Sequence, residues 1–265
     1  MAVLTAPRLS AAHWYTPDGQ PMHEVPRASG EGTRPTTLAD ARKLNLIPSV
    51  TTILRVIDKP ALMRWRMQQA ALSALRNPKQ SAESDEYWLK RVLAGAEEET
   101  DSAADIGTRI HDALELATAG EAYPPEWEVY VAPVLDWMRQ ENIRIGAREI
   151  VVVDRQTGFA GRVDVLFRQG RRYGVIDYKT RKTRPGQRVT PYDGQGMQLA
   201  AYAKAYYGQR RLPRLRAVNL YISTTEPGRL EIYEHTNLVA EYKAFTAAAW
   251  LWRHISGYDP RTITG

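Results

Sequence analysis

An acid and a base stand two residues apart in the segment VIDYKT, residues 175–180. The segment begins with residues that favour a β-strand, and it contains Asp177 and Lys179. Alternate side chains of a strand point to the same face, so this carboxylate and this ammonium should emerge side by side. Such a pair is either an ion pair on a sheet surface or part of a site that handles a charged group.

A second acid lies on the preceding predicted strand. GRVDVLF, residues 161–167, carries Asp164, and Gln169-Gly170 predicts a tight turn before the next strand. The two strands should therefore pair as an antiparallel hairpin in which Asp164 lies opposite Asp177. Two carboxylates this close repel one another unless a positive charge lies between them. Oxygen ligands at this density favour a hard divalent cation, Mg²⁺ or Mn²⁺.

The apolar periodicity changes from helical to strand-like near Gly146. Residues 1–47 are rich in Pro, Gly, Thr and Ser and predict irregular structure, with a short hairpin and a helical turn at 37–44. Residues 48–145 predict helices, among them 86–96 and about 102–119, with Ser49 as an N-cap and Pro60 at a helix start. Residues 146–265 predict three strands, a helix, a two-stranded hairpin and a last helix. We expect one α/β domain, 1–265, with a helical lobe at 48–145 and a catalytic core at 146–265.

The composition excludes several kinds of site. The 265 residues include no cysteine, which excludes disulfides, thiolate metal sites, iron–sulfur clusters and a cysteine nucleophile. The net charge is +6, and residues 168–188 contain eight Lys or Arg against one acid, which is compatible with a nucleic-acid partner. The alternative is that this basic run is a solvated face. No apolar run reaches the length of a signal peptide or a membrane span, so we expect a cytoplasmic protein with no membrane partner.

Several motifs in a fixed order resemble one nuclease superfamily. In chain order they are PSVTTIL followed by Leu62 and Trp65, GTRIH ending at His111, Gly161 with Asp164, Asp177-Tyr178-Lys179, and Gln198-Leu199-Ala200-Ala201-Tyr202. Together they resemble the PD-(D/E)XK nuclease superfamily, and more narrowly its RecB-type exonuclease branch. The first segments are similar to phage exonucleases and to the mitochondrial genome maintenance exonuclease. The resemblance implies a restriction-endonuclease-like α/β core, with a central mixed β-sheet flanked by helices, plus an N-terminal helical lobe.

The resemblance also implies the metal ligands. His111, Asp164 and Asp177 would bind Mg²⁺ or Mn²⁺, with the backbone carbonyl of Tyr178 as a further oxygen. Many relatives carry an iron–sulfur cluster, which a chain without cysteine cannot hold. Lys179 would lie beside the metal and orient or deprotonate the attacking water, or stabilise the charge that develops on the phosphate.

Glu115 lies one helical turn after His111. It would accept a hydrogen bond from a metal-bound water or bind a second metal ion. The alternative is a surface carboxylate that pairs with Arg109 or Arg162.

Further residues are expected to contact the substrate. Gln198 and Tyr202, at i and i+4 of a helix, would present an amide and a phenol to the catalytic site, although Tyr202 is alternatively a core aromatic residue. Ser49, Thr51 and Thr52 would bind phosphate near a helix start, or else simply cap the helix. The other expected nucleic-acid contacts are Trp65, Arg109, Arg162, Arg181 and Lys182.

These expectations favour a metal-dependent exonuclease that hydrolyses DNA from its ends, in phage or bacterial recombination, repair or replication. A recombination protein or a single-strand-binding protein is a further expected partner. One alternative is a structure-specific endonuclease with the same chemistry. Another is a catalytically silent DNA-binding recombination protein on the same fold.

Overall fold

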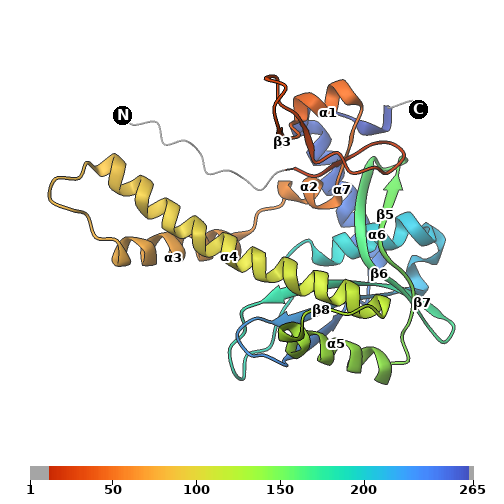
Figure 1. Cartoon of the computed structure of the whole chain (residues 1–265). Coiled ribbons are helices and arrows are strands. Elements are labelled where there is room, and N and C mark those ends of the chain that lie inside the picture. The colour runs from red at the N-terminus through yellow and green to blue at the C-terminus, as the bar shows by residue number, and fades with distance from the viewer. Residues whose placement is uncertain (1–11, 263–265) are drawn as a thin grey trace. The chain divides into compact units, whose positions relative to one another are not determined.

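The computed structural model describes residues 12–262 of the chain (Figure 1). It divides into two compact units, which are described separately. The first unit holds residues 58–112, and the second holds residues 12–57 and 113–262. The boundaries expected for the lobe and the core stay a prediction.

The first unit is a pair of helices, α3 (Pro60–Arg76) and the first part of α4 (Asp85–Ala119). Pro60 occupies the first turn of α3, as predicted. The helices expected at 86–96 and 102–119 are instead one continuous helix, so the expected break between them is wrong. The intervening residues 97–101, EEETD, contain neither glycine nor proline to interrupt a helix. At Gly95 an added Cβ would lie 2.7 Å from Ser73 Oγ. The glycine lets α4 approach α3 closely and does not end the helix.

The second unit is built on a five-stranded sheet in the order β5-β6-β7-β8-β9. Its strands are β5 (Arg144–Asp154), β6 (Phe159–Gln169), β7 (Arg172–Arg181), β8 (Arg216–Ser223) and β9 (Leu230–Glu234). All neighbouring pairs are antiparallel except β7 and β8, which are parallel. The sheet is therefore mixed, as predicted, and the parallel pair is joined by a crossover through α6 (Gln195–Tyr207).

Helices α6 and α7 (Leu238–Ser256) pack together within the main hydrophobic core. Leu199 and Ala203 of α6 and Phe245 of α7 are fully buried there with Val163 of β6 and Val175 of β7. The buried strand β7 is thus held between its neighbours and a helix layer, which fixes the direction of its side chains.

The remaining elements of the second unit are short. Two small two-stranded sheets pair β1 with β4 and β2 with β3, and Thr37 and Ser49 cap α1 and α2. The Ser49 cap agrees with the sequence prediction. The bounds are β1 (Trp14–Tyr15), β2 (Glu24–Pro26), β3 (Thr33–Pro35), α1 (Leu38–Leu44), β4 (Ile47–Pro48), α2 (Val50–Ile53) and α5 (Glu128–Gln140).

A buried ion pair joins α6 to the end of β5. Lys204 Nζ donates to Asp154 Oδ2, and their side chains are 9% and 5% exposed. Lys204→Met is expected to lower the free energy of unfolding by about 3–5 kcal/mol, because it leaves a buried carboxylate without its cation. Urea denaturation measures this loss. The exposed Lys243 of α7 gives the matched control, Lys243→Met, and an equal effect of both substitutions would contradict the prediction.

Candidate active site

The two predicted acids lie where β6 and β7 separate. The antiparallel ladder of these strands begins at Gln169↔Arg172 and ends at Val165↔Ile176, so the predicted hairpin is confirmed. At the next position Asp164 Oδ2 accepts a hydrogen bond from the backbone N–H of Tyr178 at 2.7 Å. The side chain of Asp164 takes the place of a ladder bond, which holds its carboxylate beside that of Asp177.

This pairing has a clear electrostatic consequence. Burial, and after it the charge of Asp177, raises the pKa of Asp164 well above its usual value. Lys179 opposes the shift, and its Nζ lies 2.5 Å from Asp177 Oδ2. Burial alone would lower the pKa of Lys179, but the charges of Asp177 and Asp164 outweigh burial and raise it. Lys179 is therefore a cation held against two carboxylates.

Two residues that the sequence analysis missed support Asp177, one from β8 and one directly after β9. Asn219 Nδ2 donates to Asp177 Oδ2 at 2.7 Å, and Asn219 Oδ1 lies 2.8 Å from His235 Nε2. A carboxylate only accepts, so the Asn219 amide must point its N–H to Asp177 and its oxygen to His235, which donates from Nε2. Asn219 is fully buried and His235 nearly so. The available signal was a polar residue within the apolar strand RAVNLYIS.

Asp177 is a predicted metal ligand, and an outer partner that orients a ligand typically contributes about 10–100-fold to metal affinity. Asn219→Ala is therefore expected to lower metal affinity by about that factor. The measurement is the Mg²⁺ concentration that gives half-maximal hydrolysis. Ser223→Ala is the matched control, since Ser223 is also buried on β8 but bonds to Thr183 and to the backbone of residues 225 and 226. An unchanged metal requirement in Asn219→Ala would contradict this role.

Helix α6 places Gln198 and Tyr202 over the same carboxylate. Gln198 Nε2 donates to Asp177 Oδ1 at 3.3 Å and to Tyr202 Oη at 3.1 Å. Burial, with a further contribution from Asp177, raises the pKa of Tyr202, which keeps it a phenol. Tyr202 packs on Gly161 of β6, where an added Cβ would lie 2.5 Å from Tyr202 Cε1. The glycine of the Gly161…Asp164 motif therefore makes room for this tyrosine.

Gly161→Ala is expected to lower the rate of the predicted DNA hydrolysis about a hundredfold, because it displaces Tyr202 and, through Gln198, shifts the Asp177 carboxylate. The rate is measured well below the unfolding temperature of each variant. Gly146→Ala on β5 is the control, since its Cβ would meet Leu166 O at an ordinary 3.5 Å. A wild-type rate in Gly161→Ala would show that the position of Tyr202 does not matter.

The arginines expected near Glu115 have other partners. Arg162 Nε lies 2.7 Å from Glu149 Oε2, and in the first unit Arg109 Nε lies 3.0 Å from Asp105 Oδ2. Glu149 also contributes to the raised pKa of Asp164, after burial and Asp177, so it lies near that carboxylate. Glu115 is exposed on α4. Its predicted role and those of the two arginines stay predictions.

Ser49, Thr51 and Thr52 form a hydrogen-bonded group at the start of α2. Ser49 Oγ accepts from Thr52 N–H at 2.9 Å and lies 2.9 Å from Thr51 Oγ1. Thr52 Oγ1 accepts from His13 N–H at 3.0 Å. Ser49 and Thr52 are buried, whereas Thr51 is exposed. The capping alternative is therefore observed, and phosphate binding stays a prediction.

His111 and Trp65 belong to the first unit, on α4 and α3, and both are half-buried. The metal-binding role predicted for His111 and the nucleic-acid contact predicted for Trp65 stay predictions.

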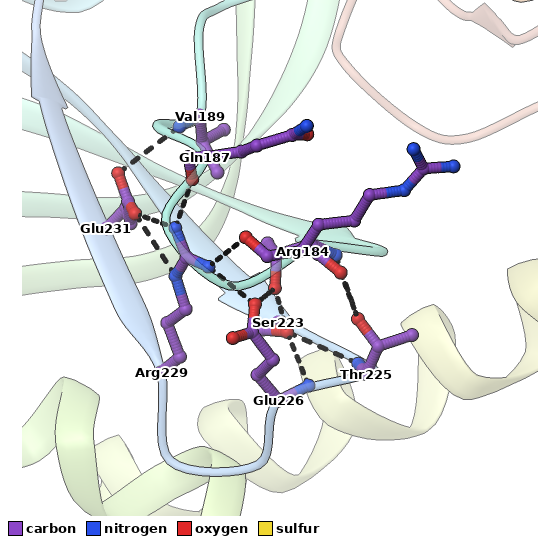
Figure 2. Close-up of polar contacts among 9 residues, drawn as sticks. Arg184, Gln187, Val189, Ser223, Thr225, Glu226, Arg229 and Glu231 are labelled. Atoms are coloured by element: carbon purple, nitrogen blue, oxygen red, sulfur yellow. Dashed lines mark hydrogen bonds and ion pairs between the residues drawn. The ribbon is translucent and has the colours of Figure 1, made fainter.

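The basic loop after β7 is fastened to the β8–β9 turn by Arg229 (Figure 2). Arg229 Nη1 donates to Arg184 O at 2.9 Å and to Glu226 Oε2 at 2.5 Å, and Nη2 donates to Gln187 O. Glu231 pairs with Arg229 and also accepts from the backbone N–H of residue 189. The Arg184 side chain points away from this network in Figure 2, so the loop is fixed while that guanidinium stays at the surface.

Arg181, the last residue of β7, and Lys182, the first residue of the loop, are both predicted to contact nucleic acid. Arg181 Nη1 donates to Thr190 O at 2.5 Å, and its guanidinium lies 4.1 Å from the centre of the Tyr192 ring. Arg181 therefore also braces the loop. Lys182 is exposed, as are Arg184 and Arg188.

Comparison with known proteins bears on this geometry. The model of the PD-(D/E)XK nuclease superfamily matches residues 121–256, which is half of the chain and includes Asp164, Asp177, Lys179, Gln198 and Tyr202. The chain belongs to the PD-(D/E)XK nuclease superfamily. No curated protein is similar enough to match. A solved structure titled "Crystal structure of SSO0001" is 15% identical, with a TM-score of 0.37, and the similarity covers 73% of this chain and 86% of that one.

PD-(D/E)XK nucleases are usually hydrolases that act on DNA and generally use divalent metals such as Mg²⁺, and the donor set found here fits such an ion. Asp164 and Asp177 supply carboxylate oxygens, and Tyr178, whose carbonyl is the further predicted ligand, directly follows Asp177 in the chain. Among residues 12–262, no three or more His, Asp or Glu side chains gather as a metal site. Two carboxylates suit Mg²⁺, which keeps several waters and binds through one or two carboxylates.

The cysteine content and the helices limit the possible cofactors and membrane segments. A PD-(D/E)XK chain without cysteine cannot hold an iron–sulfur cluster. Of the helices within residues 12–262, none combines the length and the hydropathy of a membrane-spanning segment.

Proposed function

We propose that the chain is a metal-dependent deoxyribonuclease of the RecB-type branch, which hydrolyses phosphodiester bonds from DNA ends. The observation that carries the proposal is the set of Asp164, Asp177 and Lys179 at one position of the sheet, held by buried hydrogen bonds. The proposed setting is DNA recombination, repair or replication in the cytoplasm of a bacterium or of a phage host. A recombination or single-strand-binding protein is the proposed partner.

In the proposed mechanism, Asp164, Asp177 and the carbonyl of Tyr178 hold one Mg²⁺ or Mn²⁺, with His111 as a further ligand. When bound, such an ion lowers the pKa of its water and polarises the scissile phosphodiester. Asn219 fixes the Asp177 carboxylate by donating to Oδ2. Among the described residues Oδ1 accepts only the 3.3 Å bond from Gln198, so Oδ1 is the oxygen proposed to bind the ion. Glu115 is proposed to accept from a metal-bound water or to bind a second ion.

Lys179 is proposed to act as a cation. Its Nζ lies 2.5 Å from Asp177 Oδ2, so its ammonium is placed beside the proposed metal ligands. It therefore orients the attacking water and stabilises the negative charge that develops on the phosphate. The alternative role, deprotonation of that water, requires the neutral amine.

The basic loop supports DNA as the substrate. Lys182, Arg184 and Arg188 are exposed on a loop that begins directly after the strand of Asp177 and Lys179, and Arg229 holds that loop in place. Lysine and arginine at such positions neutralise phosphates without reading sequence. The residues proposed to contact the DNA backbone or bases are Ser49, Thr51, Thr52, Trp65, Arg109, Arg162, Arg181 and Lys182.

The exonuclease mode is tested by offering linear and circular single-stranded DNA of the same sequence with Mg²⁺ or Mn²⁺. We expect the linear form to be degraded and the circle to persist. Rapid cutting of the circle would contradict the exonuclease mode and favour an endonuclease. DNA binding without hydrolysis of either form would favour the silent DNA-binding protein.

A further inference from the structure

A pocket of about 320 Å³ lies at the C-terminal end of α7, on the second unit. Its lining is unusually rich in planar and cationic side chains, namely Trp250, Arg253, His254, Gly257, Tyr258, Asp259 and Arg261. None of these residues belongs to the active site described above. The volume is at the lower end of the range for small-molecule sites, about 300–1,000 Å³, so the pocket suits one compact ligand.

An exposed aromatic platform forms one wall. Trp250 is 62% exposed, although a tryptophan side chain is usually well covered. Its ring stacks on that of His254, with ring centroids 5.7 Å apart and an angle of 5° between the planes. The two residues are one helical turn apart on α7, so the helix holds both rings parallel. A flat, exposed and pre-oriented indole is suited to stacking with another planar ring.

The polar wall is cationic. Three guanidinium groups, those of Arg42, Arg253 and Arg261, lie at or beside the pocket with one carboxylate, Asp259. Arg261 donates to both oxygens of Asp259, from Nε to Oδ1 at 2.9 Å and from Nη2 to Oδ2 at 2.5 Å, so Nη1 is its group for a ligand. Arg42 Nη2 caps α7 at Ser256 O at 2.5 Å. Arg253 donates from Nη1 alone among the described residues, to Thr157 O at 3.1 Å, which leaves further N–H groups for a ligand. Burial and the charge of Arg261 lower the pKa of Arg253, as expected where cations crowd together.

Capping of α7 does not explain this arrangement. Arg42 donates to the helix carbonyl of Ser256, and Tyr258 Oη donates to Leu46 O at 2.7 Å. These two residues therefore stabilise the fold. Neither contact requires an exposed indole or a second and third guanidinium. An aromatic platform beside an excess of guanidinium groups is the combination that recognises a base with its phosphate.

We propose that this pocket binds one nucleoside phosphate, with its base stacked on Trp250 and its phosphate on Arg253 and Arg261. The pocket is distinct from the Asp164 site. Gly158 of the β5–β6 turn packs against Pro260 and the lining residue Arg261, since an added Cβ would lie 2.8 Å from Pro260 Cγ and 3.0 Å from Arg261 Cγ. Asp164 lies six residues further along the chain, in β6. Six residues of strand span about 20 Å, so the ligand is either a free nucleotide or a distant nucleotide of a bound strand.

The test measures equilibrium binding of three probes to the full chain in EDTA, which removes the ion that the proposed hydrolysis needs. The probes are deoxyadenosine, dAMP and a single-stranded oligonucleotide. We expect dAMP to bind at one site, and deoxyadenosine, which lacks the phosphate, to bind more weakly. Trp250→Ala should weaken dAMP binding about tenfold or more, which is within the usual contribution of stacking on a base. Arg261→Gln should also weaken it.

Tyr206→Ala is the matched control, because Tyr206 is 52% exposed on a helix of the same unit but lies outside the pocket. A parallel loss of oligonucleotide affinity in Trp250→Ala assigns the site to a nucleotide of a strand, and a loss for dAMP alone assigns it to a free nucleotide. The proposal is overturned if dAMP does not bind, or if Trp250→Ala binds dAMP as tightly as Tyr206→Ala. This outcome is separate from the nuclease assay, since binding is measured without hydrolysis.

Discussion

Asp177→Asn is expected to lower the rate of metal-dependent DNA hydrolysis at least about a thousandfold. Several kcal/mol of charge stabilisation depend on a correctly held metal, and each 1.4 kcal/mol corresponds to tenfold in rate. Asp177 is the residue that most of the site contacts, because Lys179, Gln198 and Asn219 all donate to its carboxylate. The amide keeps the size of the side chain but removes the charge that would hold the cation.

The measurement is the single-turnover rate on end-labelled DNA at saturating Mg²⁺. DNA binding in Ca²⁺ should persist in Asp177→Asn, which separates loss of chemistry from loss of folding. Asp193→Asn, at an exposed position in the loop before α6, is the matched control and should retain the wild-type rate. Hydrolysis by Asp177→Asn at the wild-type rate would remove the carboxylate from the mechanism.

Lys179→Met is expected to lower the same rate about 10²–10³-fold, as removal of one preorganised donor to a developing anion does. Methionine keeps the unbranched stem, so the loss reports the ammonium group. The metal requirement should change less than in Asp177→Asn, because Lys179 is not a ligand. The two substitutions therefore separate metal holding from charge stabilisation.

Lys182→Met is the control for Lys179→Met, because Lys182 is an exposed lysine three residues further along the chain. Its substitution should weaken DNA binding and make that binding less sensitive to salt, with little effect on the rate at saturating DNA. If Lys182→Met lowers the saturated rate as much as Lys179→Met, the catalytic role of Lys179 is contradicted.

The parts of the site that the sequence predicts are those set by local geometry. Alternation along a strand brings Asp177 and Lys179 to one face, and helical spacing does the same for Gln198 and Tyr202. The Gln169-Gly170 turn fixes the register that sets Asp164 beside Asp177. Each relation spans few residues, so the pattern alone determines it.

The parts that the sequence does not predict depend on long-range pairing. Asn219 reaches Asp177 because β8 runs parallel to β7 in a register that pairs these two residues, and no local pattern specifies that register. His235 reaches Asn219 only after β9 has folded back on β8. The close packing of Gly95 against Ser73 likewise depends on a helix nineteen or more residues earlier in the chain.

One time course tests the metal-dependent mechanism most directly. Wild-type protein and Asp177→Asn are each incubated with end-labelled single- and double-stranded DNA in Mg²⁺, in Mn²⁺ and in EDTA. We predict release of labelled product by the wild type with either metal, none in EDTA, and none by Asp177→Asn in any condition. Hydrolysis by the wild type that continues in EDTA, or that Asp177→Asn performs equally well, would contradict the role assigned to Asp164, Asp177 and Lys179.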